Sequence, residues 1–438
     1  MTIFMKVNIP ESNQERIVIV GGGFAGLNLA KKICKLDYQV VLVDKYNYHQ
    51  FQPLFYQVAT AGLEPSSIAF PFRKLFQSEK RDFFIRIAEV TAVNTEEQFL
   101  DTTLGVMNYD HLVVAIGADT NFFGNENLAK HCLPMKSMGE ALHLRNEILK
   151  DYEYALSTIE YEARQGFIDV VIVGGGPTGV EVAGALAEMR AYILPKDYKE
   201  LNSKEVDIYL IQSGPVLLKG MSEKASAAAL KFLTKLGVKV QLNSRVVDVD
   251  GDFVYLKDGT TIRAKKVIWA AGIKGNTIAG MPEESLVRGN RIKVNRFNQV
   301  EGLKNIYAIG DVAYMEEGET YPQGHPQVAQ VAIQQSKQLA KNFKNILKQK
   351  ELRPFSYKDK GSMATIGRHL AVVDLPRFSF TGFFAWFVWL FIHLLAIIGR
   401  RNKVIVFINW VWNYFTYDQS LRLIMKTKEP KRKATKIS

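Results

Sequence analysis

The residues with the clearest chemical meaning lie in two glycine-rich stretches, GGGFAG at 21–26 and GGGPTG at 174–179. Each stretch follows a short apolar run typical of a buried strand and precedes a helical pattern. In such a unit the first glycine permits a tight turn, the second lets a pyrophosphate approach the backbone, and the third lets the helix pack closely on the strand. The helix then presents free N–H groups to the phosphates. The sequence therefore predicts two dinucleotide sites, formed by Gly21, Gly23 and Gly26 and by Gly174, Gly176 and Gly179.

The strand that follows each helix normally ends in an acid that accepts hydrogen bonds from ribose hydroxyls. The first unit has Asp44 in this place, whereas the second has Gln212. An amide repels a 2′-phosphate less than a carboxylate does, so the second site should discriminate less strongly against NADPH. We expect NADH to be the favoured donor and NADPH to be a second candidate.

Three further apolar runs end in glycine, and each resembles a sheet strand whose carboxyl end meets a ligand. They are LVVAIGA (112–118), VIWAAGI (267–273) and NIYAIGDVA (305–313), which place Gly117, Gly272 and Gly310 at the edge of a sheet. The segments 85–110 and 238–265 instead alternate polar and apolar residues, which predicts small antiparallel sheets. The expected fold class is α/β, with two Rossmann-like dinucleotide-binding domains.

The composition is that of a folded globular protein of two or three domains, with 438 residues of which 47% are apolar and 23% charged. A net charge of +12 is compatible with binding to a nucleic acid, an anionic membrane or an acidic ligand. Where the basic residues lie along the chain must distinguish these partners. The basic residues gather beside apolar segments without a nucleic-acid motif, so no nucleic-acid partner is expected. Cys34 and Cys132 stand far apart, which argues against a disulfide framework and a metal site. The amino terminus lacks a secretory pattern, which favours folding in the cytoplasm.

The segment 382–398, GFFAWFVWLFIHLLAII, has no charged residue among its seventeen. As a helix it would be about 25 Å long, slightly short of the roughly 30 Å hydrocarbon core of a bilayer. A second apolar and aromatic segment follows at 404–426. A spanning helix, a buried core helix and a pair of helices at the membrane interface are all open interpretations. The Trp and Tyr residues and the basic tail at 426–438 favour the interfacial pair on an anionic membrane surface.

The same two segments carry stripes of small or polar residues that indicate the faces packed on the protein body. In the first segment the stripe is Gly382, Ala385, Trp389, His393 and Ala396, and in the second it is Asn409, Asn413, Thr416 and Ser420. The remaining surface of both amphipathic helices is expected to face lipid.

Three separate segments make the chain resemble the type 2 NADH:quinone oxidoreductases: YNYHQFQPLFYQVATAGL at 46–63, AQVAIQQ at 329–335, and the aromatic carboxyl end. The resemblance implies a flavoprotein with a single FAD at the first glycine stretch and NADH at the second. It implies electron transfer from cytoplasmic NADH to a membrane quinone, menaquinone or ubiquinone, without proton pumping. The family is monotopic and often dimeric, which implies a peripheral protein on the cytoplasmic face of the cell inner membrane and a homodimer.

The resemblance, together with the strand-end glycines, assigns residues to both nucleotides. FAD would be held by Gly21, Gly23, Gly26, Asp44, Gly117, Gly310 and Asp311, and NADH by Gly174, Gly176, Gly179, Gln212 and Gly272.

The acceptor side is expected at 329–335. Gln330 and Gln334 are four residues apart, so on a helix both amides project from one face, able to reach quinone oxygens or the flavin edge. Two such glutamines are usually a solvated face, and only the resemblance makes the quinone role the stronger interpretation. Ile333 would form an apolar wall of the slot. Glu181 would relay protons or hold the nicotinamide; that it only complements the helix dipole is equally open.

Two rival functions are weaker. A sulfide:quinone oxidoreductase relies on redox-active cysteines, which two dispersed cysteines do not readily supply. A membrane-tethered flavoprotein that only senses nucleotides is the rival from another class. The predicted domains are an FAD-binding domain split between 1–122 and 295–375, an inserted NADH-binding domain at 123–294, and an anchor at 376–438.

Overall fold

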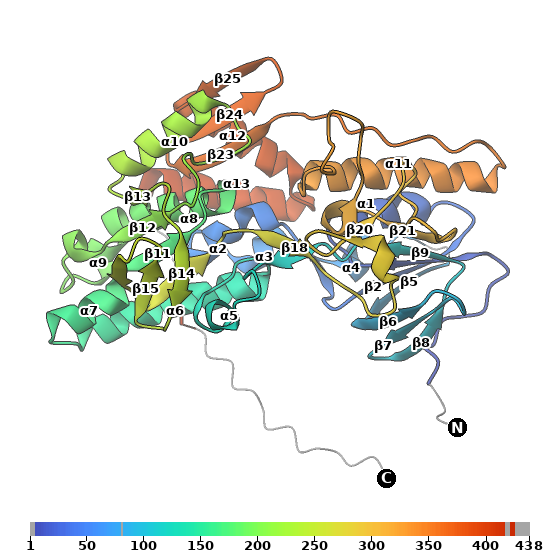
Figure 1. Ribbon diagram of the computed structural model, residues 1–438, viewed down its shortest axis with the longest axis horizontal. Coiled ribbons are helices and arrows are strands. Elements are labelled where there is room, and N and C mark those ends of the chain that lie inside the picture. The colour runs from blue at the N-terminus through green and yellow to red at the C-terminus, as the bar shows by residue number, and fades with distance from the viewer. Residues whose placement is uncertain (1–4, 80–81, 417–420, 425–438) are drawn as a thin grey trace, which may run out of the picture.

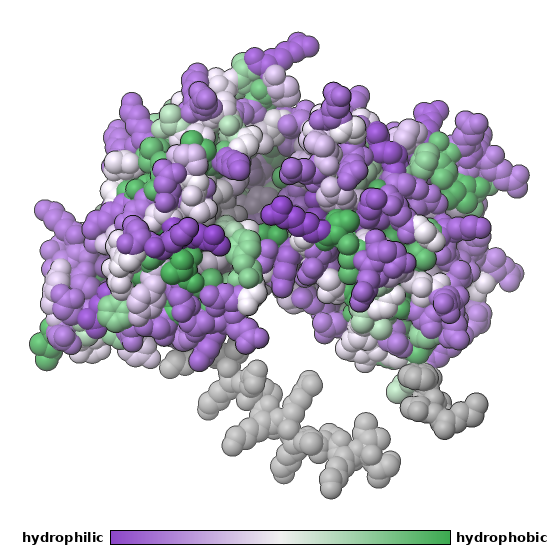
Figure 2. All heavy atoms as spheres, in the orientation of Figure 1, coloured by the Kyte–Doolittle hydropathy of each residue, from purple (hydrophilic) through white to green (hydrophobic). Residues whose placement is uncertain are grey.

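The computed structural model describes residues 5–79, 82–416 and 421–424 (Figure 1). Two parallel sheets lie in separate halves of the molecule, and the carboxyl-terminal helices lie on the side of the half drawn at the left in the same view. The face in Figure 2 is largely hydrophilic and is hollowed between the two halves.

The first sheet has five parallel strands in the order β21-β9-β1-β2-β5. Their bounds are Arg16–Val20 (β1), Gln39–Asp44 (β2), Phe83–Ile87 (β5), His111–Val114 (β9) and Ile306–Ala308 (β21). Most of these strand residues are buried on both faces, which is why they form apolar runs without alternation. Helices α1 (Phe24–Ile33) and α11 (Ala329–Leu347) lie side by side on this half (Figure 1).

The second sheet has four parallel strands in the order β13-β12-β11-β17. Their bounds are Val170–Val173 (β11), Ile208–Ile211 (β12), Lys239–Gln241 (β13) and Lys266–Trp269 (β17). Helix α8 (Pro177–Glu188) follows β11 and continues into a π-helical turn, Met189–Ile193. The chain enters this half through β10 (Ala118–Thr120) and leaves it through β18 (Ile273–Gly275), which pair antiparallel.

Two small antiparallel sheets confirm the alternating patterns seen in the sequence. One contains β6, β7 and β8 (Val90–Asn94, Phe99–Thr102 and Gly105–Asn108), and the other β14, β15 and β16 (Val246–Val249, Phe253–Leu256 and Thr261–Arg263). The second includes a tight turn, in which Gly259 adopts φ +89° and the Leu256 N–H donates to Thr260 O at 2.9 Å.

The carboxyl-terminal part combines a third antiparallel sheet with two helices. Its strands are β23 (Ser362–Gly367), β24 (Leu370–Leu375) and β25 (Phe378–Thr381), and its helices are α12 (Phe383–Ala396) and α13 (Arg400–Thr416). Within the described ranges, no helix has both the length and the apolar character needed to cross a membrane.

The remaining elements connect these layers. Helices are α2 (Phe55–Ala59), α3 (Pro65–Ile68), α4 (Phe72–Leu75), α5 (Glu126–His131), α6 (Met138–Leu156), α7 (Tyr161–Ile168), α9 (Leu194–Asp197) and α10 (Glu223–Lys235). Short strands are β3 (Tyr48–Gln50), β4 (Ala69–Pro71), β19 (Leu286–Val287), β20 (Arg291–Lys293) and β22 (Ala313–Tyr314), and a 3₁₀ turn, η5 (Gly310–Val312), follows β21.

Candidate functional site

The first nucleotide cradle lies where β1 turns into α1. A Cβ on Gly26 would lie 1.9 Å from Gly21 O, so only glycine permits this close approach of helix and turn. Gly21 adopts φ +101°, and a Cβ there would lie 2.4 Å from Ala115 O. Around Gly23, in contrast, nothing lies within 4 Å, which leaves room for a ligand at the amino terminus of α1.

Asp44, at the end of β2, is fixed beside this cradle. Its Oδ2 accepts a hydrogen bond from the Gly22 N–H at 2.5 Å, and its Oδ1 accepts one from the Tyr46 N–H at 2.7 Å. Burial raises the pKa of Asp44, and the two backbone N–H groups oppose this shift. Each carboxylate oxygen keeps a lone pair for a ribose hydroxyl.

The second cradle repeats the first almost residue by residue. A Cβ on Gly179 would lie 1.9 Å from Gly174 O, Gly174 adopts φ +111°, and nothing lies within 4 Å of Gly176. Gln212 stands in the place of Asp44, and its Oε1 accepts a hydrogen bond from the Gly175 N–H at 2.9 Å. The acceptor role of the missing acid is thus kept, while Nε2 adds a donor that a carboxylate lacks.

The 3₁₀ turn η5 brings Gly310 and Asp311 to the first cradle. A Cβ on Gly310 would lie 3.1 Å from the Ala25 Cβ, which puts the turn directly against α1. The Gly310 N–H donates to Gln335 Oε1 at 2.7 Å. Burial raises the pKa of Asp311, and the positive charges of Lys136 and Arg291 oppose the shift. Sequence analysis missed Gln335, although it is the third glutamine of AQVAIQQ.

These features fit FAD at the first cradle. Around the strand-end Gly117, as around Gly23, nothing lies within 4 Å, so the edge of the first sheet is open for a dinucleotide. At the second sheet, a Cβ on Gly272 would meet only the side chain of Phe123, at 3.2 Å.

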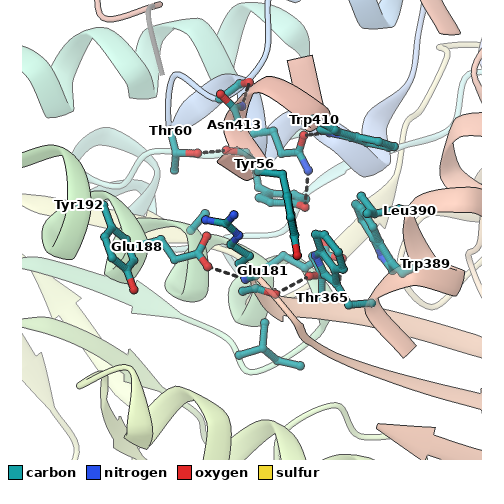
Figure 3. Close-up of a pocket in the computed structure, with 18 of the residues that line it drawn as sticks. Tyr56, Thr60, Glu181, Glu188, Tyr192, Thr365, Trp389, Leu390, Trp410 and Asn413 are labelled. Atoms are coloured by element: carbon teal, nitrogen blue, oxygen red, sulfur yellow. Dashed lines mark hydrogen bonds between the residues drawn. The ribbon is translucent and has the colours of Figure 1, made fainter. Parts of the chain in front are cut away.

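A pocket lies between α2, α8, β23 and the helix pair α12 and α13 (Figure 3). Its empty space, including the open mouth, is about 890 Å³. The residues that line it come from segments far apart in the chain and include Tyr56, Gln57, Glu181, Glu188, Tyr192, Thr365, Arg368, Trp389, Leu390, Trp410 and Asn413. Of the residues predicted for chemistry, Glu181 lies here.

Glu181 projects from the first turns of α8 into this pocket (Figure 3). Burial raises its pKa to about 8, although the Thr365 N–H, 3.5 Å from Oε1, favours the ionised form. A carboxyl group with this pKa is largely protonated at neutral pH and can give up its proton at little cost.

Hydrogen bonds tie the helix pair to the pocket. Gln57 donates from Nε2 to the Tyr56 hydroxyl at 2.7 Å and accepts at Oε1 from the Trp410 N–H at 2.8 Å. Asn413 donates to Gly62 O at 3.2 Å. The polar stripe of the second helix faces the body at Asn413, as predicted, while Ser420 lies outside the described residues. In α12, Ala385 and Trp389 are buried as expected, but Ala396 is exposed because the helix ends there.

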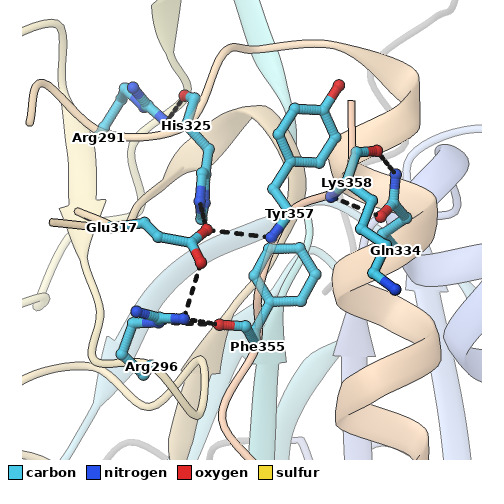
Figure 4. Close-up of polar contacts among 8 residues, drawn as sticks. All are labelled: Arg291, Arg296, Glu317, His325, Gln334, Phe355, Tyr357 and Lys358. Atoms are coloured by element: carbon cyan, nitrogen blue, oxygen red, sulfur yellow. Dashed lines mark hydrogen bonds and ion pairs between the residues drawn. The ribbon is translucent and has the colours of Figure 1, made fainter. Parts of the chain in front are cut away.

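Gln330 and Gln334 project from one face of α11, but the structure does not bring them into this pocket. Gln334 donates to Lys358 O at 2.9 Å and accepts from the Lys358 N–H at 3.2 Å (Figure 4). Gln330 donates to Gly361 O at 2.8 Å and accepts from the Lys360 N–H at 3.2 Å. Both amides therefore hold the segment that leads into β23. Ile333, between them, is partly exposed.

Charged groups hold the residues just before this segment (Figure 4). Glu317 accepts from the Tyr357 N–H at 3.0 Å, from Arg296 at 2.9 Å and from His325 Nε2 at 2.8 Å. These partners lower the pKa of Glu317 to about 2 against the opposing effect of burial. The contacts fix the segment that precedes β23 between α11 and Glu317.

Known proteins match most of the chain. The family described as pyridine nucleotide-disulphide oxidoreductase matches residues 15–336, and the NDH2 C-terminal domain matches residues 360–417. The type II NADH:quinone oxidoreductase Ndh of Mycobacterium tuberculosis is 35% identical over 92% of this chain and 89% of its own. The type II NADH:quinone oxidoreductase of Haemophilus influenzae is 30% identical over 83% of this chain and 87% of its own.

Solved structures share the fold. NDH2 from Plasmodium falciparum, in complex with NADH, has a TM-score of 0.86 at 22% identity and covers 94% of this chain and 100% of its own. The sulfide:quinone oxidoreductase of Aquifex aeolicus has a TM-score of 0.69 at 19% identity, with 92% and 95% covered. The relatives at 30% identity or more, together with the two family models, show that this chain belongs to the type II NADH:quinone oxidoreductases.

Proposed function

We propose that this chain oxidises NADH held at the second cradle, with FAD held at the first, and reduces a quinone in the pocket beside Glu181. As in its family, the enzyme is an FAD-dependent NADH:quinone oxidoreductase that pumps no protons. The residues assigned to each nucleotide, and the pocket assigned to the quinone, are the new part of the proposal.

One observation carries the assignment of the pocket. Helix α8 begins at the second cradle and carries Glu181 into a cavity whose opposite wall includes aromatic residues of α12 and α13. The pocket thus joins the nucleotide-binding part to two helices that expose large apolar side chains. A quinone has a polar ring and an apolar tail, and both kinds of surface meet here.

When bound, FAD supplies the redox chemistry by accepting a hydride and releasing electrons to a second substrate. The chain's own residues bind and orient both partners. Gly23, Gly117, Asp44 and Asp311 would hold FAD, and Gly176 with Gln212 would hold NADH. Glu181 would supply a proton to the quinone.

We keep Gln330, Ile333 and Gln334 as proposed quinone-binding residues, although they lie outside the pocket beside Glu181. Each glutamine amide uses one donor and one acceptor on the 358–361 backbone, so one N–H of each stays available for a quinone oxygen or the flavin edge. Substituting both glutamines with alanine would test whether they serve the quinone or only the segment that leads into β23.

A sulfide:quinone oxidoreductase activity would need a pair of redox-active cysteines, and this chain does not offer a suitable pair. Cys34 and Cys132 are both free and buried, and they belong to two different apolar clusters. Burial raises the pKa of both thiols, to about 11 and about 12, which suppresses thiolate chemistry.

The first experiment measures the two half-reactions separately by stopped-flow. NADH should reduce the flavin rapidly, and a menaquinone or ubiquinone analogue should reoxidise it at once. A reduced flavin that persists with both quinones would favour the nucleotide-sensing rival.

We also infer that the helix pair holds the protein on a membrane surface as a peripheral protein of the cell inner membrane, on the cytoplasmic face. Large apolar side chains that are exposed follow both helices: Phe383, Phe384, Phe387, Phe391, Ile392 and Leu395 on α12, and Val404, Phe407, Ile408, Val411, Trp412 and Phe415 on α13. Arg400 and Arg401, the first two residues of α13, are exposed and would meet anionic headgroups.

Binding to liposomes tests this inference. Replacing Phe387, Phe391, Phe407 and Phe415 with serine should abolish flotation with anionic vesicles while flavin binding is kept. The matched control replaces Ile159 and Tyr161, which are also exposed but lie in the NADH half, and should float like the wild type. Sedimentation of the same samples in detergent would test the homodimer that the family resemblance implies.

A further inference from the structure

Quinone reduction by NADH consumes one proton that must come from solution. In the overall reaction NADH, one proton and the quinone give NAD⁺ and the quinol, so the ring gains two electrons and two protons. This inference rests on the proposed function, because it concerns the route by which protons reach the quinone pocket.

Glu188 lines the same pocket as Glu181, seven residues further along α8. Seven residues are about two helical turns, so both side chains leave one face of the helix, from backbone positions about 10 Å apart along its axis. Figure 3 shows Glu188 between Glu181 and Tyr192. Tyr192 lies in the π-helical turn that follows, lines the pocket and is 41% exposed, which marks this end as the one open to water.

Strand β23 and the turn that follows it contact both carboxyl groups from the opposite side. The Thr365 N–H faces Glu181, and the Arg368 N–H donates to Glu188 Oε1. The two elements are in direct backbone contact, because a Cβ on Gly184 would lie 1.6 Å from Ile366 O. The spacing of the two acids is therefore built into the packing of α8 on β23.

The charges around Glu188 suit a group that takes up and releases a proton. Burial raises its pKa, while the guanidinium and N–H of Arg368 oppose the shift. The groups that face it are Arg368 from the β23–β24 turn, Tyr56 from α2, Tyr192 from the π-helical turn, and Glu181 on its own helix. The Tyr56 phenol is affected by the charges of both acids, so it lies within electrostatic reach of each.

We propose that Glu188 is the proton-entry residue of this pocket, taking a proton from water at the Tyr192 mouth and passing it toward Glu181. Protonated Glu181 gives its proton to the quinone oxygen as the ring receives its electrons, which leaves a carboxylate. The Glu188 O–H bond then breaks as a chain of waters, with the Tyr56 hydroxyl, carries a proton to that carboxylate, which regains its O–H bond. A hydronium ion at the mouth, the one proton that the overall reaction takes from solution, reprotonates Glu188.

Variants can separate a proton-carrying role of Glu188 from a purely structural one. The Arg368 N–H needs only an oxygen to donate to, so Glu188→Gln keeps that contact but carries no proton. Glu188→Asp keeps the acid at a shorter reach. Glu200→Gln is the matched control, because Glu200 is an exposed acid outside the pocket.

The experiment uses the holoenzyme reduced by one equivalent of NADH without oxygen and then mixed with a short-chain ubiquinone. In Glu188→Gln we expect flavin reoxidation to slow at least tenfold and its solvent deuterium isotope effect to rise, while reduction by NADH stays within twofold. Glu188→Asp, or a small buffer acid added to the Gln variant, should restore part of the rate. The control should match the wild type.

A readout without turnover accompanies this test. Infrared spectra of the oxidised enzyme near neutral pH should show protonated carboxyl absorption that is weaker in Glu188→Gln. Reoxidation at the wild-type rate, slowing with an unchanged isotope effect and no rescue, or an unchanged infrared band would each overturn the proposal. Failure of the wild type to be reoxidised by any quinone would instead overturn the proposed function.

Discussion

The two nucleotide cradles have nearly the same backbone but differ in what covers them. In the first, Phe24 packs edge-on against His49 and Phe51, with ring centroids 5.3 and 5.8 Å apart, and Ala25 is buried beneath Gly310. In the second, the corresponding Pro177 and Thr178 are exposed. One cradle is enclosed by the surrounding fold, and the other opens to solvent.

This difference matches the needs of a retained cofactor and an exchanging substrate. A ligand covered by η5 and α11 must displace packed structure to leave, so it stays through many turnovers. A ligand at an exposed helix terminus can dissociate after each hydride transfer. Identical glycine patterns therefore do not tell the two roles apart; the covering segments, distant in sequence, do so.

Alanine at the third glycine of each cradle should give the largest effects and separate the two roles. Both Cβ atoms would lie 1.9 Å from a backbone oxygen, so the turn must move. Gly26→Ala should yield protein without flavin, whereas Gly179→Ala should keep flavin and lose at least a hundredfold in reduction by NADH, about 2.7 kcal/mol. Flavin absorbance and stopped-flow reduction measure the two losses. Loss of flavin in both variants would contradict the separation.

Gln335 of α11 holds the turn η5, which covers the first cradle. Gln335→Leu leaves the Gly310 N–H without its acceptor, which costs about 1–3 kcal/mol at a buried site. We expect FAD to dissociate about tenfold more readily, or more, as measured by fluorescence of released flavin on dilution. Gln338→Leu, on the same helix but bonded to Arg353 O, is the control and should retain flavin. Equal retention in the two variants would show that the turn does not need this bond.

The acid-to-amide difference between the cradles should set the choice of donor. Gln212→Glu keeps an oxygen for the Gly175 N–H but places a negative charge where NADPH carries its 2′-phosphate. The ratio of kcat/KM for NADH over NADPH should rise by about tenfold, or about 1.4 kcal/mol. A ratio that does not change would mean that other residues exclude or admit the phosphate.

Much of the fold could be predicted from the sequence because the signals are local. The turn between β1 and α1 needs its glycines within six residues, and parallel strands buried on both faces must be apolar. The pocket could not be predicted in this way, because Tyr56, Glu181, Thr365 and Trp389 meet only through packing. Gln330 and Gln334 show the same limit: their helical face was predictable, but their partners at 358–361 were not.

Glu181 has a counterpart in the first cradle, since Asn28 stands at the same distance from the third glycine. The Asn28 side chain donates to Phe24 O of its own helix at 2.7 Å, whereas Glu181 points into the pocket. Because the pKa of Glu181 is raised to about 8 in the folded protein, the folded state binds more protons than the unfolded state between its ordinary value, near 4.5, and pH 8. The free energy of unfolding must therefore fall as pH rises through this window and stay lowered above it.

Glu181→Gln removes this pH dependence, because glutamine carries no charge at any pH. Relative to the wild type, the melting temperature of the variant should rise by a few degrees between pH 5 and pH 9. Scanning calorimetry of the flavin-loaded protein measures it, with Glu200→Gln as an exposed control that should follow the wild type. If the difference in melting temperature between variant and wild type does not change with pH, Glu181 ionises as freely as an exposed acid. Glu181 and Asn28 would then differ only in where their side chains point.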